Sequence, residues 1–165
     1  MPRLICALLL ASAPALAANP GPGPAGPAAA QILSKIHAAN LAEIRAGELA
    51  MRQGNNPQVR AYGERLMRDH RYADNRALAM AGTLGVQLRA VPQQPQQPPP
   101  AGPGFDRAFL EQMEASHQQA IAMLTAAAPR LQNRRLAGLV DNLVPILQQH
   151  LAVARALLRT AQPNG

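Results

Sequence analysis

The sequence predicts an all-α fold, a bundle of four helices. Alanine and leucine dominate the composition and aromatic residues make up only 2% of the chain, a balance that favours helices over sheets. Apolar side chains recur at spacings of three and four residues in four stretches. Segments rich in proline and glycine separate these stretches, and a length of 165 residues suits a single domain.

Residues 1–17 have the features of a secretory signal peptide. Arg3 supplies the positive charge, and the apolar run that begins at Leu4 is too short to cross a membrane. Small residues then form a cleavage pattern, so we expect cleavage after Ala17. The alternative is an N-terminal anchor that is kept. No other stretch is long and apolar enough to span a bilayer, and we therefore expect an exported, periplasmic protein.

Export also decides how the cysteine and the net charge are interpreted. Cys6 is the only cysteine and lies inside the signal peptide, so the mature chain has no thiol for catalysis or for a zinc–thiolate site. The net charge of +7 comes almost entirely from arginine. Nucleic acid is not expected as a partner outside the cytoplasm, whereas an anionic envelope surface is available there.

The mature chain should begin with a tether and a helical hairpin. Residues 18–28 repeat proline and glycine, which is typical of a flexible tether. We expect helices at residues 29–53 and 57–84. Asn56 suits the cap and Pro57 the first position of the second helix. The short connection predicts that the two helices pack antiparallel.

The segment 86–104 predicts a long linker, because proline and glutamine interrupt it and no periodicity is present. About 17 extended residues span roughly 50 Å. A helix of about 28 residues is roughly 42 Å long. The linker can therefore run the length of the bundle, as the crossover of ferritin-like bundles does, or form a slack loop in an up-down-up-down bundle.

Two more helices should complete the domain, which we place at residues 29–162. The third is expected at residues 105–128, before Pro129. The fourth is expected at residues 131–160 and contains Pro145 in its interior, where a proline removes one hydrogen bond. Together the four helices are expected to form one bundle, in either of the two arrangements that the linker allows.

Three histidines lie on the apolar faces of their helices near mid-height, His70, His117 and His150, and Glu43 lies at a comparable depth on the first helix. At about 1.5 Å per residue, their depths in the bundle differ by roughly 5 Å. Buried imidazole and carboxylate groups are costly unless they are paired or bind a metal. The sequence therefore leaves two explanations. One is a divalent metal site for iron, zinc, manganese or copper, and the other is a hydrogen-bonded His/Glu network.

Two further carboxylates are weaker candidates for metal ligands. Glu114 and His117 have the Glu-x-x-His spacing of di-metal bundles, but Glu114 lies on the flank of its helix. Asp69 precedes His70 and should point about 100° away from it. No nucleophile elbow, phosphate loop or paired-carboxylate site is present in the sequence, so an enzyme is the least favoured class.

Five segments resemble the bacterial family called domain of unknown function 4142 (DUF4142). They are LAEIRAGELA at 41–50, VRAYGERLMRDH at 59–70, FDRAFL at 105–110, MEASH at 113–117 and LVPILQQHL at 143–151. The resemblance covers about residues 32–158. It implies a ferritin-like bundle, export, no established activity, and recurrent polar positions at Glu43, His70, His117 and His150. Ser116 and the Pro/Gln linker depart from the family pattern.

Two functions follow as hypotheses. The first is a ferritin-like bundle that binds a divalent metal at mid-bundle, in metal handling or stress protection. The second is a non-enzymatic structural or interaction module of the cell envelope, with its histidines in a purely hydrogen-bonded network.

Overall fold

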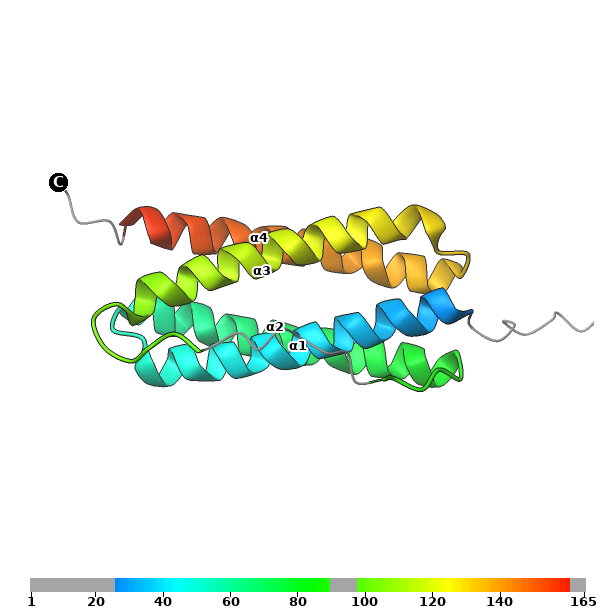
Figure 1. Ribbon diagram of the computed structural model, residues 1–165, viewed down its shortest axis with the longest axis horizontal. Helices are drawn as coiled ribbons and strands as arrows, with labels where there is room; N and C mark the ends of the chain where they lie inside the picture. Colours follow the sequence, from blue (N-terminus) through cyan, green and yellow to red (C-terminus); the bar gives the residue numbers. More distant parts are fainter. Residues whose placement is uncertain (1–25, 90–97, 161–165) are drawn as a thin grey trace, which may run out of the picture.

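The computed structural model describes residues 26–89 and 98–160, and these residues form a four-helix bundle (Figure 1). No helix in these two ranges is long and apolar enough to cross a membrane. The four helices confirm the predicted all-α four-helix bundle. The predicted signal peptide and residues 18–25 of the tether lie outside the described residues. The helices are α1 (Pro27–Gln53), α2 (Pro57–Thr83), α3 (Phe105–Ala127) and α4 (Arg134–Thr160).

The ends of the first two helices follow the expected local chemistry. The Asn56 side chain accepts a hydrogen bond from the Gln58 backbone N–H at 2.8 Å and so caps α2. At its other end Gly85 has a φ of 62°, which glycine adopts without strain. The Val86 N–H then donates to the Ala81 carbonyl oxygen at 2.8 Å, the contact that closes a Schellman ending.

Helices α1 and α4 begin at other residues than expected. Helix α1 starts two residues earlier, at Pro27, because proline suits a first helical position. Helix α4 starts at Arg134, so the expected start at residue 131 is wrong. A short 3-10 helix, Ala128–Arg130, follows α3, and the Asn133 side chain caps α4 by accepting from the backbone N–H groups of Arg135 and Leu136. Pro145 lies inside α4, which continues past it.

Helix α2 ends and helix α3 begins at opposite ends of the bundle (Figure 1). Helix α3 begins beside the α1–α2 turn, where Asp106 accepts hydrogen bonds from the backbone N–H groups of Asn55 and Asn56, each at 2.8 Å. Helix α2 ends at the opposite end, where Leu84 packs in the same cluster as Leu136 of α4. Helices α2 and α3 therefore run parallel (Figure 1), which selects the crossover over the up-down-up-down alternative.

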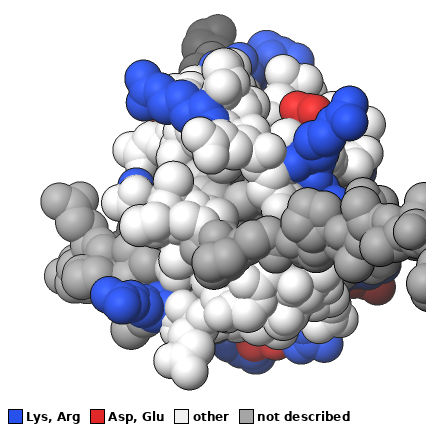
Figure 2. Space-filling model, turned by 90° about the vertical axis from the view of Figure 1, so that its right-hand side faces the viewer, with Lys and Arg blue, Asp and Glu red and all other residues white. Residues whose placement is uncertain are grey.

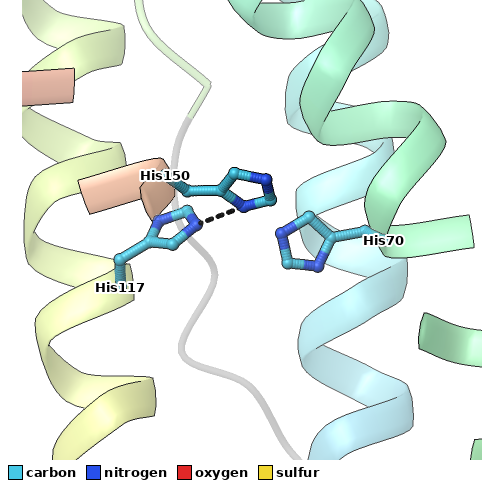
Figure 3. A group of neighbouring side chains, drawn as sticks. All are labelled: His70, His117 and His150. Atoms are coloured by element: carbon cyan, nitrogen blue, oxygen red, sulfur yellow. Dashed lines mark hydrogen bonds between the residues drawn. The ribbon is translucent and has the colours of Figure 1, made fainter. Parts of the chain in front are cut away.

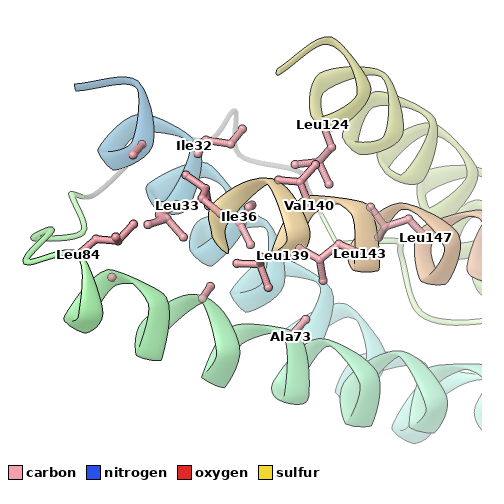
Figure 4. Close-up of a cluster of buried hydrophobic side chains, with 14 residues drawn as sticks. Ile32, Leu33, Ile36, Ala73, Leu84, Leu124, Leu139, Val140, Leu143 and Leu147 are labelled. Carbon is pink, nitrogen blue, oxygen red and sulfur yellow. The ribbon is translucent and has the colours of Figure 1, made fainter. Parts of the chain in front are cut away.

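Two apolar clusters fill the bundle, one toward each end. Figure 4 shows the cluster nearer the α3–α4 turn, which includes Leu33, Leu139 and Val140. The cluster nearer the α1–α2 turn includes Leu66 and Phe109. The layer between the clusters is where the predicted polar residues lie, so the apolar packing that stabilises the fold also positions them.

Figure 2 views the end of the bundle at which α1 begins and α2 ends. Lysine and arginine side chains are scattered over this face, some of them beside acidic side chains, and among the described residues drawn there they form no continuous basic patch. An anionic envelope surface as partner stays a prediction.

Candidate metal centre

Three histidines from three helices meet between the apolar clusters (Figure 3). His70 comes from α2, His117 from α3 and His150 from α4, and their relative exposures are 4%, 0% and 0%. Their ring centroids lie 5.3 to 5.8 Å apart. One nitrogen from each ring can be chosen so that the three atoms lie within 4.8 Å of one another. The arrangement therefore offers three imidazole ligands to a single point.

The hydrogen bonds of His117 determine which of its nitrogens carries the proton. Its Nδ1 lies 2.8 Å from the backbone oxygen of Met113, one turn earlier in α3. Because a carbonyl oxygen only accepts, Nδ1–H must donate. In the neutral ring the Nε2 atom then has a free lone pair, and this is the atom that faces His150.

The position of the proton on His150 follows from the same reasoning. Its Nε2 lies 3.0 Å from Asp69 Oδ2. Burial raises the pKa of the Asp69 carboxyl. The hydrogen bond from His150 and the nearby arginines lower this pKa by more, so the net pKa is below its usual value. An ionised carboxylate only accepts, so His150 Nε2–H donates and Nδ1 has the lone pair.

The two rings consequently face each other with no proton to share. His117 Nε2 and His150 Nδ1 are 3.3 Å apart, and in the neutral rings both are acceptors. A protonated His150 would supply the missing hydrogen, but burial lowers its pKa to about 4. While both rings are neutral, the two facing lone pairs could bind a cation between them, and a metal ion is one such cation.

His70 completes the set. Its Nδ1 lies 2.9 Å from Asn40 Oδ1 on α1 and donates to it, which leaves the lone pair on Nε2. The Nε2 atom is buried and has no hydrogen-bond partner. Figure 3 shows one ring nitrogen of His70 directed at His117 and His150. Burial lowers the pKa of His70 to about 4, which keeps the ring neutral, as a metal ligand must be.

The spacing of the nitrogens suits one ion. Two imidazole nitrogens bound to the same ion at about 2.0–2.1 Å lie about 3.3–3.6 Å apart at tetrahedral to trigonal angles. The distance from His117 Nε2 to His150 Nδ1 is 3.3 Å. The atom from His70 lies within 4.8 Å of the others, so the rings would have to come closer together for all three to bind one ion.

Glu43 lies beside the histidines and approaches His117 at its Nδ1 atom. Its Oε1 accepts a hydrogen bond from Ser116 Oγ–H at 2.6 Å and lies 3.8 Å from His117 Nδ1. Its Oε2 is buried without a partner. In the described part of the chain Glu43 has no ion pair with lysine or arginine, so a bound cation would balance its charge. Its role as a fourth ligand stays a prediction.

The other predicted candidates have different partners. Glu114 pairs with Arg155 at 2.8 Å, on a partly exposed face of α3. Asp69 does not join the three histidines but holds His150 through its outer nitrogen, which is a common way to orient a metal ligand. The contacts made by Asn40 and Ser116 could not be predicted from the sequence, because short polar residues on helices are usually solvated or bond locally.

The family model described as domain of unknown function (DUF4142) matches residues 12–157. The chain belongs to the DUF4142 family. No curated protein matches its sequence. The suspected resemblance is thus confirmed, and the match extends further toward the N-terminus than the segments noted above.

A DUF305 fragment and CopM have solved structures whose fold is similar to that of this DUF4142 protein. A DUF305 fragment from Deinococcus radiodurans has a TM-score of 0.71 at 19% identity, covering 83% of this chain and 99% of its own. CopM in its Cu(I)-bound form has a TM-score of 0.72 at 15% identity, covering 82% and 98%. CopM in its Ag-bound form has a TM-score of 0.67 at 14% identity, covering 80% and 96%. At these identities the likeness shows the fold alone.

The low pKa values predict how the stability of the metal-free protein depends on pH. His150 titrates near pH 4 when folded and near 6.5 when unfolded. The unfolded chain therefore binds more protons between these values, and stability falls as the pH drops from about 6.5 toward 4. The loss is on the order of 3 kcal/mol for this group at about 1.4 kcal/mol per pKa unit. Urea unfolding at pH 7.5, 6 and 5 measures it, and a profile that stays flat would contradict the neutral, buried ring.

Proposed function

We propose that this DUF4142 protein binds one transition-metal ion at the centre of its bundle, in metal handling or stress protection. His70, His117 and His150 are the proposed ligands. The observation that carries the proposal is the pair of facing lone pairs on His117 Nε2 and His150 Nδ1, 3.3 Å apart. A purely hydrogen-bonded network, the second hypothesis, would need a proton between these atoms, so one of the two rings would have to carry a second proton.

Copper is the ion that the donor set favours. Three imidazoles without a thiolate suit copper or zinc, and copper has the higher affinity for such sites, whereas manganese prefers oxygen ligands. The likeness of the fold to CopM, solved with Cu(I) and with Ag, supports this choice. Because His117 and His150 are 0% exposed, the ion would be shielded from solvent, which suits storage or protection. The predicted signal peptide would place this function in the periplasm.

The experiment is a metal titration of the purified mature protein with Cu(I), Cu(II), Zn(II) and Mn(II). We expect one equivalent of copper to bind and to raise the melting temperature, because a ligand at 1,000 times its Kd stabilises the folded state by about 4 kcal/mol. If no metal binds stoichiometrically and none raises the melting temperature, the proposal fails and the envelope module becomes the better account.

The carboxylate of Asp69 should influence metal affinity without touching the ion. Asp69 accepts from His150 Nε2–H and so keeps the lone pair of that ring on Nδ1. We expect Asp69→Asn to weaken copper binding by about 10–100-fold, which is typical when the hydrogen-bond partner of a metal ligand is lost. Competition with a copper-binding dye measures the change. Asp141→Asn, on the exposed face of α4, is the control, and equal affinities in both variants would show that Asp69 has no orienting role.

A further inference from the structure

Three buried side-chain atoms in the described residues have no hydrogen-bond partner: Asn40 Nδ2, Glu43 Oε2 and His70 Nε2. Buried polar atoms almost always have one, so three in the same place need an explanation. All three residues line one cavity of about 40 Å³ among the helices. A cavity needs about 10–15 Å³ to hold a water molecule, so this one has room for a ligand.

A metal ion on the three histidines would account for only one of these atoms, His70 Nε2. Asn40 and Glu43 would still be buried without full pairing, at 5% and 8% exposure. They lie three residues apart on α1, a spacing that places both side chains on one face of the helix. Their free atoms are complementary, because Asn40 Nδ2 donates and Glu43 Oε2 accepts.

The rest of the cavity restricts what can occupy this position. Apolar side chains form much of its wall, among them Ile36, Met123 and Leu143. A volume of about 40 Å³ holds roughly one to three non-hydrogen atoms. The ligand must therefore be small, must accept a hydrogen bond from Asn40 and must donate one to Glu43. A hydroxylic molecule, of which water is the smallest, has both properties.

We propose that this cavity is a binding site for a small exogenous hydroxylic ligand, held by Asn40 and Glu43 beside the metal ion. The inference rests on the proposed function, because the ion supplies the third contact. Three protein ligands leave a coordination position open, as in metal sites that accept an outside molecule. Glu43 thereby has the role of a hydrogen-bond partner for that molecule, next to the ion.

Carbon monoxide is the probe that tests the open position. It is a two-atom neutral molecule that binds Cu(I). Unlike a hydroxylic ligand it donates no hydrogen bond, so its C–O stretching band reports binding at the open position and the charges of the side chains around it. We expect the anaerobic Cu(I)-loaded protein to bind one equivalent of carbon monoxide and to show a single band. Ala120→Leu enlarges a side chain in the cavity wall and leaves all three histidines in place. It should keep its copper and bind carbon monoxide at least ten-fold more weakly.

Two substitutions test whether Asn40 and Glu43 contact the ligand. Asn40→Asp keeps an oxygen for His70 but removes the N–H donor, so the band should move to higher frequency. Glu43→Gln removes a negative charge, so the band should move to lower frequency. The directions are opposite because a positive dipole near the oxygen of carbon monoxide weakens the C–O bond and a negative charge strengthens it. Glu111→Gln, on the exposed face of α3, should leave the band unchanged.

The outcomes separate this inference from the proposed function. A protein that takes up one Cu(I) but gives no carbon monoxide band has no open position, which overturns the inference and leaves the metal site standing. A band that neither Asn40→Asp nor Glu43→Gln moves would show that these residues do not contact the ligand, which also overturns it. A protein that takes up no Cu(I) overturns both proposals.

Discussion

Replacing His70 with glutamine is expected to lower the copper affinity of the protein by at least about 100-fold. The buried Nε2 atom of His70 has no partner of its own, so the substitution removes a metal ligand without breaking a hydrogen bond at that atom. The glutamine amide can still donate to Asn40 Oδ1, the atom that now accepts from His70 Nδ1 at 2.9 Å. The loss should exceed the 10–100-fold effect of a residue that only orients a ligand.

The measurement is competition against a chelator of known copper affinity, with circular dichroism to verify that the variant folds. His37→Gln is the matched control. His37 is the remaining histidine of the chain, lies on α1 with a side chain 26% exposed, and pairs with Asp74 at 2.7 Å. We expect its copper affinity to equal that of the unchanged protein. Equal affinities for the His70 and His37 variants would mean that copper binds elsewhere.

Replacing Gly47 with alanine is expected to destabilise the bundle by about 1–3 kcal/mol, the usual cost of an extra methyl group in a packed interior. Helices α1 and α2 pack closely where Gly47 meets Gly63. A Cβ atom on Gly47 would lie 2.5 Å from the backbone oxygen of Gly63 and 3.1 Å from the backbone N of Met67. Because these atoms belong to the backbone of α2, the helices would have to separate.

Gly138→Ala provides the control for the gain in helix propensity. Gly138 lies inside α4, and a Cβ atom there meets nothing within 4 Å. This variant should gain up to about 1 kcal/mol, because alanine loses less backbone entropy than glycine in a helix. Urea unfolding of both variants, free of metal, gives the two free energies. An equal gain at Gly47 would show that the two helices are not in close contact.

Much of the fold could be predicted from the sequence because local chemistry decides it. The cap at Asn56 and the proline after it lie where expected. The start of α4 could not be found from periodicity, because Leu131 extends the apolar pattern to residues before the helix. The Asn133 side chain, which caps α4 by accepting from the Arg135 backbone N–H, sets the start instead. The topology depends on the end of the bundle at which α3 begins. The hydrogen bond between Asn55 and Asp106 places that start beside the α1–α2 turn.

The candidate site was predictable only in part. The three histidines stand out because each interrupts an apolar stripe at a similar depth, and depth follows from helix geometry. Rotation about the helix axis and the side-chain conformation do not follow from depth. They determine that Glu43 accepts a hydrogen bond from Ser116 and that Asp69 binds His150 at Nε2, the ring nitrogen that does not face His117. The lone pairs that face each other depend on hydrogen bonds that no sequence pattern records.

X-ray absorption spectroscopy of the protein loaded with one equivalent of Cu(I) identifies the atoms that hold the ion. If His70, His117 and His150 hold the ion, the spectrum should show three nitrogen neighbours at about 2 Å, with the outer-ring scattering of imidazole and no sulfur. A sulfur neighbour would place the copper at methionine side chains. A shell without imidazole scattering would place it at the surface, and either result would contradict a metal centre built from these three histidines.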